Sequence, residues 1–263
     1  MASHYVHQLN PVLLDLGAVQ VRWYGLMYVV GFLLAGFLLK HLVRTNFLKV
    51  AEEKIDSLIT TSILCMFLGA RFAYVFIYNW DYYSQNLMDL LAVWKGGLSF
   101  HGALVGLIVG GVIFARQNKL SWMEVMDSVA LAGSQGLFFG RIGNFINGEL
   151  YGRITSSSIG IIFPQGGPFP RHPSQLYEAF LEGILLFIIL WFVKSRVKIY
   201  GIIGAYFVGL YGIFRFIVEF FREPDSQLGY YFGLITMGQI LCSLMIFAGV
   251  GLIIYAKKKN ITI

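Results

Sequence analysis

The sequence predicts an all-α integral membrane protein with seven transmembrane helices, and two observations carry this prediction. Hydrophobic residues make up 57% of the 263-residue chain and charged residues only 13%, whereas a soluble domain carries about 25% charged residues. The mean hydropathy is +0.68. Seven apolar runs also approach the roughly 20 residues that a helix needs to cross a bilayer. They lie at 22–42, 56–78, 98–116, 124–147, 175–194, 201–221 and 233–256.

We expect these runs to form a single membrane-embedded domain over residues 1–263, because the composition gives no sign of a separate soluble domain. Two gaps between the runs are long enough to hold extra structure. The gap at 79–97 contains four tryptophan and tyrosine residues and suits a segment at the membrane surface. The gap at 148–174 contains four of the six prolines, which predicts a small extracytoplasmic head.

The distribution of lysine and arginine predicts the orientation. Of 20 such residues, 12 lie in the gaps on the side of the C-terminus, five lie on the opposite side and three lie within helices. Positive residues collect in the cytoplasmic loops of membrane proteins. We therefore expect the N-terminus outside and the C-terminus in the cytoplasm. This explains the net charge of +6 without nucleic acid, which we do not expect the chain to bind.

The three arginines within the predicted helices are Arg71, Arg141 and Arg215. A charge at the bilayer centre costs about 2.5–3.5 kcal/mol, so each of them is a candidate functional residue. The predicted topology places all three in the outer halves of their helices. Further polar residues fall at the same depth, namely Tyr24, His101, Glu178 and Glu182. The polar side chains therefore gather towards the outer side of the membrane.

Spacing then predicts which side chains share a helix face. Glu219 and Arg222 follow Arg215 by four and seven residues, and Asn144 follows Arg141 by three. Several arginines around one cavity indicate an anion, because guanidinium groups bind phosphate through paired hydrogen bonds. A phospholipid head group is the phosphate available at that depth. A transporter or flippase of an anionic lipid is the alternative, although it needs polar groups near the midplane.

Structural explanations compete with the functional ones. Arg141 with Glu149, and Arg215 with Glu219, can be ion pairs that hold helices together. His101 can be a hydrogen-bonded core histidine.

Two further motifs favour a structural role. Gly102, Gly106 and Gly110 are spaced for close helix packing. Ser174 is a candidate N-cap of the fifth helix.

Neither cysteine indicates a metal or redox centre. Cys65 and Cys242 fall inside apolar runs and lack the spacing of metal ligands, so we expect buried, reduced thiols. No cluster of histidine and acidic residues has metal-ligand spacing. We expect neither a metal nor a cofactor.

Five tracts form a pattern that extends along nearly the whole chain. They are RWYGLMYVVGF (22–32), GGLSFHGALVG (96–106), GRIGNFINGELYGR (140–153), RHPSQLYE (171–178) and GLYGIFRFIVEFFREPD (209–225). Together they resemble the bacterial phosphatidylglycerol–prolipoprotein diacylglyceryl transferases, and the third tract is similar to the signature of that family. One departure is Ala103, where a second glycine is expected.

The resemblance implies a multi-pass enzyme of the bacterial plasma (inner) membrane whose active site faces the periplasm or exterior. Such an enzyme transfers the diacylglyceryl group of phosphatidylglycerol to the thiol of the lipobox cysteine in a prolipoprotein signal peptide. The product is a thioether, and glycerol phosphate leaves. This is the first step of bacterial lipoprotein maturation, and no metal is required.

Roles for particular residues also follow from the resemblance. Arg141 and Arg215 would stabilise the charge that develops on the leaving phosphate. The thiol proton would pass to His101, or alternatively to Glu149 or Glu219. The implied catalytic residues are His101, Arg141, Arg215 and Glu149. The residues implied to bind phosphatidylglycerol are Arg141, Asn144, Tyr24, Gly152, Glu219 and Arg222.

Overall fold

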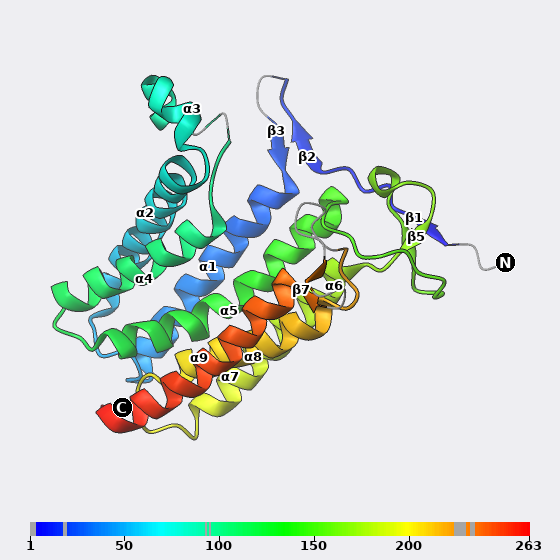
Figure 1. Cartoon of the computed structure of the whole chain (residues 1–263). Helices are drawn as coiled ribbons and strands as arrows, with labels where there is room; N and C mark the ends of the chain where they lie inside the picture. Colours follow the sequence, from blue (N-terminus) through cyan, green and yellow to red (C-terminus); the bar gives the residue numbers. More distant parts are fainter. Residues whose placement is uncertain (1–3, 18–19, 93, 95, 224–229, 232–234) are drawn as a thin grey trace. The chain divides into compact units, whose positions relative to one another are not determined.

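The computed structural model shows a mostly helical chain (Figure 1). It describes residues 4–17, 20–92, 94, 96–223, 230–231 and 235–263. Contacts divide the chain into two compact units. The larger unit consists of residues 1–37 and 130–263, and the smaller unit consists of residues 38–129.

Helices make up most of both units. The α-helices are α1 (Trp23–Arg44), α2 (Ile55–Ala73), α3 (Trp80–Gln85), α4 (Phe100–Gln117), α5 (Trp122–Asn147), α6 (Ser174–Glu178), α7 (Leu186–Lys194), α8 (Ile202–Val218) and α9 (Met237–Lys259). Short 3-10 helices are η1 (Glu52–Lys54), η3 (Leu87–Leu91) and η5 (Pro164–Gly166), and π-helical segments are η2 (Tyr74–Tyr78) and η6 (Ala179–Leu185). The short strands are β1 (Tyr5–Val6), β2 (Val12–Asp15), β3 (Gln20–Arg22), β4 (Ile161–Ile162), β5 (Pro170–Arg171), β6 (Tyr230–Tyr231) and β7 (Ile235–Thr236).

Within the described residues, five helical stretches are long and apolar enough to cross a membrane. They are Trp23–Arg44, Glu52–Tyr78, Phe100–Gln117, Ser174–Lys194 and Met237–Lys259. By length and composition the chain is therefore an α-helical, multi-pass membrane protein. The first residues of the predicted run 233–256, residues 233 and 234, lie outside the described part.

Two of the seven predicted runs do not meet the same criteria. The run 201–221 corresponds to α8, which has 17 residues and counts as a shorter apolar helix. The run 124–147 lies in α5, which has 26 residues. That helix carries acidic, amide and arginine side chains along its length, which lowers its hydropathy.

In the smaller unit, α2 packs closely against α4 through glycines (Figure 1). A Cβ atom at Gly106 would meet the carbonyl oxygen of Cys65, and one at Gly102 would meet the carbonyl oxygen of Gly69. The prediction of close packing at this glycine repeat is confirmed. Small residues let two helix backbones approach where side chains would keep them apart.

Arg71, a candidate functional residue on sequence grounds, clamps a loop of the smaller unit. It lies on α2 and is only 7% exposed. Its guanidinium donates to the carbonyl oxygens of Asp89, Leu90, Gly96 and Gly97 at 2.6–3.1 Å. These four bonds engage all three nitrogens of the side chain, so this arginine holds the backbone between α3 and α4.

Arg71→Lys is expected to loosen this loop, because an ammonium group cannot reach carbonyls that a planar guanidinium spans. Loss of even one or two charge-assisted bonds amounts to about 2 kcal/mol or more of local stability. Hydrogen exchange of the amides at 86–92 measures the effect. Arg44→Lys is the matched control, because that arginine pairs with Glu52 on an exposed surface. Equal protection in both variants would contradict the clamp.

The head of the larger unit is built around a small sheet with the order β1-β4-β5. Strand β1 pairs with β4 in parallel, with Tyr5 opposite Ile161, and β5 pairs with β4 in antiparallel. Phe163 is fully buried beside the ring of His7, at a centroid distance of 5.2 Å. The N-terminal segment thus completes the structure formed by the proline-rich tract.

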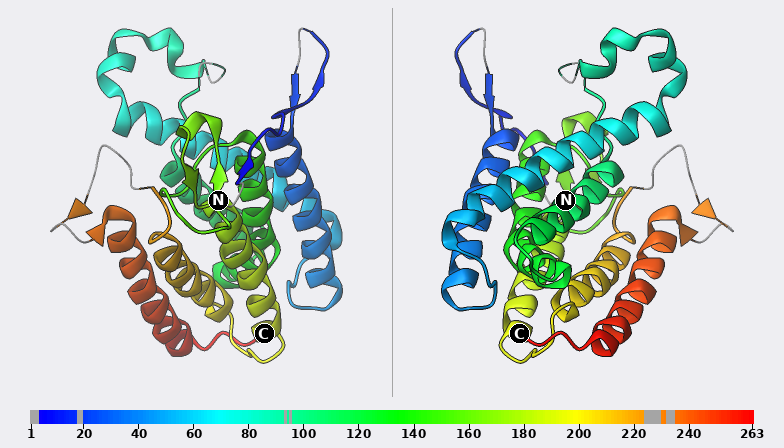
Figure 2. Two further views of the ribbon diagram at one scale, coloured as in Figure 1. Left: turned by 90° about the vertical axis from the view of Figure 1, so that its right-hand side faces the viewer. Right: turned by 90° about the vertical axis from the view of Figure 1, so that its left-hand side faces the viewer.

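Helices α8 and α9 run side by side in the same unit (Figures 1 and 2). A Cβ atom at Gly249 would lie 2.8 Å from the Cα of Gly209, so the two backbones approach through glycines here as well. Thr236 caps α9, and its hydroxyl accepts a hydrogen bond from the backbone N–H of Gln239. This cap fixes the start of α9 next to the end of α8.

Candidate active site

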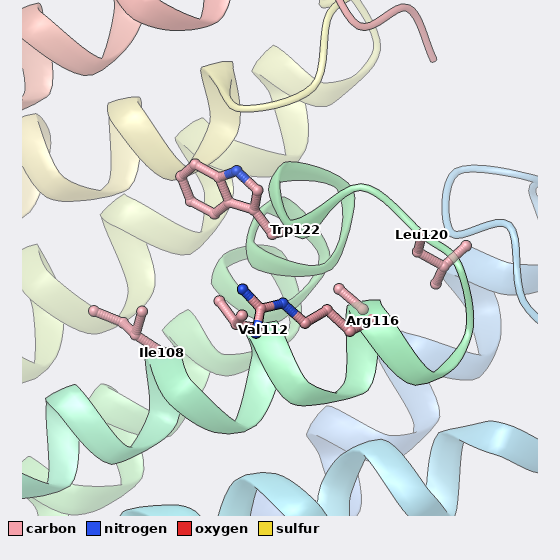
Figure 3. Close-up of a pocket in the computed structure, with 6 residues that line it drawn as sticks. Ile108, Val112, Arg116, Leu120 and Trp122 are labelled. Carbon is pink, nitrogen blue, oxygen red and sulfur yellow. The ribbon is translucent and has the colours of Figure 1, made fainter.

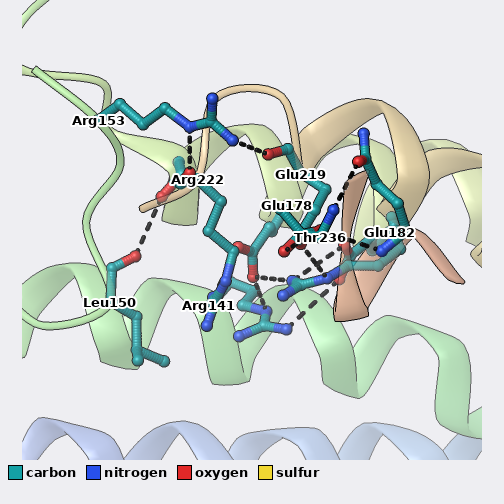
Figure 4. A network of polar contacts seen from close by, with 11 residues as sticks. Arg141, Leu150, Arg153, Glu178, Glu182, Glu219, Arg222 and Thr236 are labelled. Atoms are coloured by element: carbon teal, nitrogen blue, oxygen red, sulfur yellow. Dashed lines mark hydrogen bonds and ion pairs between the residues drawn. The ribbon is translucent and has the colours of Figure 1, made fainter. Parts of the chain in front are cut away.

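Three arginines of the larger unit converge on two carboxylates (Figure 4). Arg141 comes from α5, Arg215 from α8 and Arg222 from the turn after α8. The carboxylates belong to Glu178 at the end of α6 and Glu182 in the π-helical segment η6. We call these five residues, together with Glu219, the arginine cluster.

Glu178 is the hub of the arginine cluster. One of its oxygens lies 2.6 Å from Nε of Arg141 and 3.1 Å from Nη1 of Arg215. The other lies 3.3 Å from Nη1 of Arg222. The residue is fully buried. A buried carboxylate needs such partners, because an unpaired charge in a low dielectric is costly.

Glu182 is the second buried carboxylate and the more loosely paired. It lies 3.5 Å from Nη2 of Arg141 and 3.6 Å from Nη1 of Arg215. The sequence prediction placed both acids on the outer side of the membrane but not in the site. The spacing of these two acids could have indicated their place in the site, because acids four residues apart in an apolar run share a helix face.

Glu219 joins the cluster from the end of α8. Its carboxylate lies 3.4 Å from Nε of Arg215, four residues earlier, which confirms the predicted shared face. The hydroxyl of Thr236 donates to the same carboxylate at 3.3 Å. The ion pair therefore also connects α8 to the capped start of α9.

The arginine cluster is electrically neutral, with three guanidinium groups and three carboxylates. Several of its ion pairs lack the alignment of hydrogen bonds. Among the described residues, both oxygens of Glu182 and Nη1 of Arg215 have no hydrogen-bond partner. A well-aligned bond to a charged group contributes about 1.5–3 kcal/mol. A ligand whose anionic oxygens align better can therefore compete with Glu182 for the arginines.

The proposed pairing of Arg141 with Glu149 is wrong. Gly148, at φ +67°, follows α5 in the left-handed conformation that glycine tolerates, and the chain turns back. The carboxylate of Glu149 then accepts hydrogen bonds from the amides of Asn144 at 2.8 Å and Asn147 at 3.2 Å. Glu149 thus fixes Asn144 one turn beyond Arg141.

The tract RHPSQLYE holds this turn in place. Ser174 is not the helix cap, because Pro173 occupies that position. Its hydroxyl instead donates to the carbonyl oxygen of Leu150 at 3.0 Å (Figure 4). Gln175 donates to the carbonyl oxygen of Glu149 at 2.6 Å. Two tracts far apart in sequence therefore meet beside the arginine cluster.

Tyr24 lies against α5 close to the same turn. A Cβ atom at Gly143 would meet the Tyr24 ring at 2.8 Å, so only glycine leaves room for the ring. Tyr24 shares a hydrogen bond of 3.0 Å with Tyr28. It is also close enough to Glu149 and Arg141 for electrostatic interaction.

Gly152 has a structural role that the sequence did not show. Its backbone N–H donates to the carbonyl oxygen of His172, and a Cβ atom here would meet the carbonyl oxygen of Phe221. The neighbouring Arg153 donates to the carbonyl oxygens of Arg222 at 2.7 Å and Glu219 at 3.2 Å. These contacts tie the head to the end of α8, where the cluster lies.

His172 makes the stability of this junction dependent on pH. Packing against Tyr177 and Phe221 lowers the pKa of His172 below its ordinary value, because burial disfavours the charged imidazole. The unfolded chain then binds a proton more readily than the folded chain. The free energy of unfolding is therefore not reduced by His172 above about pH 6.5. It decreases as the pH falls below that value and becomes constant again below the pKa of His172 in the folded chain.

Thermal unfolding of the wild type between pH 7.5 and pH 5 measures this dependence. The melting temperature is expected to decrease towards low pH, and the decrease is expected to be smaller in His172→Gln. An identical pH profile in the two proteins would contradict the assignment.

His101 belongs to the smaller unit. It is exposed, so the interpretation as a core histidine is wrong. Its Nδ1 lies 3.2 Å from the hydroxyl of Tyr78 at the end of η2. The described part of the chain contains no group of three or more histidine, cysteine or acidic residues that could hold a metal ion.

A family model for the prolipoprotein diacylglyceryl transferases matches residues 11–255, a range that contains the whole arginine cluster. The chain belongs to this family. It is therefore a membrane-embedded transferase, and a transporter or flippase is not favoured.

Similar proteins support the family assignment over the full length. A protein of Desulfotalea psychrophila is 46% identical over 258 residues, which is 96% of this chain and 95% of the relative. One from Nitratidesulfovibrio vulgaris strain DP4 is 48% identical, covering 94% of both chains. One from Pasteurella multocida is 47% identical, covering 99% of this chain and 100% of the relative. All three are named phosphatidylglycerol–prolipoprotein diacylglyceryl transferase.

Proposed function

We propose that the chain transfers the diacylglyceryl group of phosphatidylglycerol to the lipobox cysteine of a prolipoprotein signal peptide, the first step of lipoprotein maturation. The names of the relatives supply the donor and the acceptor protein. The arginine cluster is the structural observation that carries the proposal. The thiol sulfur forms a bond to the glyceryl carbon while the bond from that carbon to the phosphate oxygen breaks. Glycerol phosphate leaves with the electron pair, and a base takes the thiol proton.

In this reaction Arg141 and Arg215 bind the phosphate. A phosphodiester carries one negative charge, and the glycerol phosphate that leaves carries up to two. Fixed guanidinium groups in a low dielectric stabilise the charge that develops in the transition state. Glu182 is the partner that the phosphate replaces, because its distances to both arginines are the longest in the cluster. Glu178 and Glu219 keep the arginines oriented.

The remaining binding residues surround Arg141 and the end of α8. We place Asn144 and Tyr24 at the glycerol and ester oxygens, Arg222 at the rim of the cluster, and Gly152 where the head meets it. We propose His101 as the base ahead of Glu149 and Glu219, on the interactions that each would lose by accepting the proton. The exposed His101 can accept the thiol proton without losing an ion pair. Glu149 would first lose two amide hydrogen bonds, and Glu219 its pairing with Arg215.

We further propose seven spans within one domain, with the N-terminus outside, the C-terminus in the cytoplasm and residues 148–174 as an extracytoplasmic head. Helices α5 and α8 supply the two spans beyond the five that meet the length and hydropathy criteria. The site would then face the periplasm or exterior of the inner membrane. Labelling of cysteines placed at residues 8 and 262 in intact cells tests this orientation. Labelling at 262 but not at 8 would contradict it.

Reconstitution tests the proposed reaction. Purified protein is placed in phosphatidylglycerol-containing vesicles with a lipobox peptide, and the peptide is analysed by mass spectrometry. We expect a diacylglyceryl adduct on the cysteine and one glycerol phosphate released for each adduct. A peptide with serine in place of the cysteine is the control and should not react. No adduct from folded protein would contradict the proposal.

A further inference from the structure

A groove in the smaller unit lies at the C-terminal end of α4, one of the five candidate spans (Figure 3). Its volume is about 380 Å³, and it is lined by Ile108, Val112, Ala115, Arg116, Leu120 and Trp122. Five of these six side chains are hydrophobic. The groove therefore has the character of a site for hydrocarbon, with one cation at its end.

Arg116, in the last turn of α4, supplies the one charged side chain among the described residues that line this groove. Figure 3 shows its side chain lying back along α4, with the guanidinium between Val112 and Trp122. Long side chains on a helix point towards its N-terminus, which here directs the charge over apolar residues. Among the described residues, no acidic side chain pairs with this guanidinium. The charge thus lies at an apolar surface without a counter-ion.

Trp122 lines the groove on the other side of the guanidinium (Figure 3). It begins α5 and is 41% exposed, and its indole N–H has no hydrogen-bond partner in the described part of the chain. Tryptophan prefers the head-group region of a bilayer because its ring is apolar and its N–H is polar. The groove therefore presents a guanidinium donor at one end, a tryptophan of the head-group region beside it, and hydrocarbon-like side chains along α4.

We infer that this groove binds an anionic phospholipid of the surrounding bilayer, separate from the substrate lipid at the arginine cluster. The phosphate accepts hydrogen bonds from Arg116, and one acyl chain lies along Val112 and Ile108. An anionic lipid fits better than a zwitterionic one, because no acidic side chain among the described residues pairs with Arg116 and a choline group would bring a second cation. Lys119, exposed three residues later, adds to the positive potential. The inference does not depend on the transferase reaction.

Fluorescence quenching by brominated lipids tests this site. The other four tryptophans, Trp23, Trp80, Trp94 and Trp191, are replaced by phenylalanine, so that Trp122 alone reports contact with bromine. The protein is placed in vesicles that contain brominated phosphatidylserine or brominated phosphatidylcholine at equal mole fraction. We expect the anionic lipid to be preferred by roughly five-fold, the contribution of one basic residue near a membrane surface.

Two variants separate the groove from general surface charge. Arg116→Gln should abolish the preference, whereas Lys119→Gln removes the same charge on the neighbouring turn and should retain most of it. Equal quenching by both lipids in the parent protein would overturn the inference, and so would equal loss in the two variants. Because Trp122 is part of the groove, lipid bound at the arginine cluster does not produce this signal. A failure here leaves the proposed transferase activity intact.

Discussion

Replacing Arg141 or Arg215 by glutamine is expected to lower the rate of diacylglyceryl transfer by about 10²–10³-fold in each case. The loss of one preorganised donor to a developing charge costs this much in well-studied active sites. The effect should appear mainly in kcat, because the charge on the phosphate increases in the transition state. The measurement is the rate of adduct formation on a lipobox peptide, with membrane insertion of each variant confirmed separately.

Removing one arginine also leaves the cluster with one carboxylate more than guanidinium groups, so a second variant must separate charge balance from phosphate binding. The double substitution Arg141→Gln with Glu182→Gln keeps the cluster neutral. If Arg141 binds the phosphate, the double variant folds normally and its activity stays about 10²–10³-fold below that of the wild type. Recovery of wild-type activity in the double variant would contradict a direct role for Arg141.

Glu178→Gln is expected to have the largest effect on stability. This carboxylate holds three arginines within 3.3 Å and is fully buried. Removing one partner from a buried ion pair destabilises a protein by about 3–5 kcal/mol, because the remaining charges stay buried without compensation. Thermal unfolding in detergent, with and without phosphatidylglycerol, measures the loss.

Two matched substitutions calibrate this result. Glu182→Gln removes a carboxylate whose arginine distances are longer, 3.5 and 3.6 Å, and should cost clearly less. Glu223→Gln removes the exposed partner of Arg171 and should cost about 0–1 kcal/mol. Similar losses of stability in Glu178→Gln and Glu223→Gln would show that Glu178 does not hold the arginine cluster together.

The sequence was sufficient for the features that depend on spacing along one helix. Apolar runs located the five helices that meet the criteria for spanning a membrane, and the four-residue spacing placed Glu219 beside Arg215. The glycine repeat of α4 predicted close packing, because the absence of side chains has the same consequence against any partner helix. These features can be predicted without knowing which helices are neighbours.

Pairing between distant segments could not be predicted in the same way. Glu149 is an available acid close to Arg141 in the sequence, but the turn at Gly148 directs it to Asn144. The partner of Arg141 comes from a helix more than thirty residues later. Likewise, Arg71 is an intramembrane charge by sequence, and only the fold shows that backbone carbonyls occupy its donors.

The most direct test of the central claim is a distance measurement between arginine nitrogen and lipid phosphorus. Protein with ¹⁵N-labelled arginine is placed in glycolipid bilayers, with phosphatidylglycerol as the only source of phosphorus. An Arg116→Gln background excludes the groove of the smaller unit. Solid-state NMR should detect a nitrogen–phosphorus separation of about 4 Å, as a guanidinium–phosphate hydrogen bond requires. The signal should decrease in the Arg141→Gln, Glu182→Gln variant, which retains Arg215. A signal of equal intensity there, or none in the parent, would contradict the proposed phosphate binding.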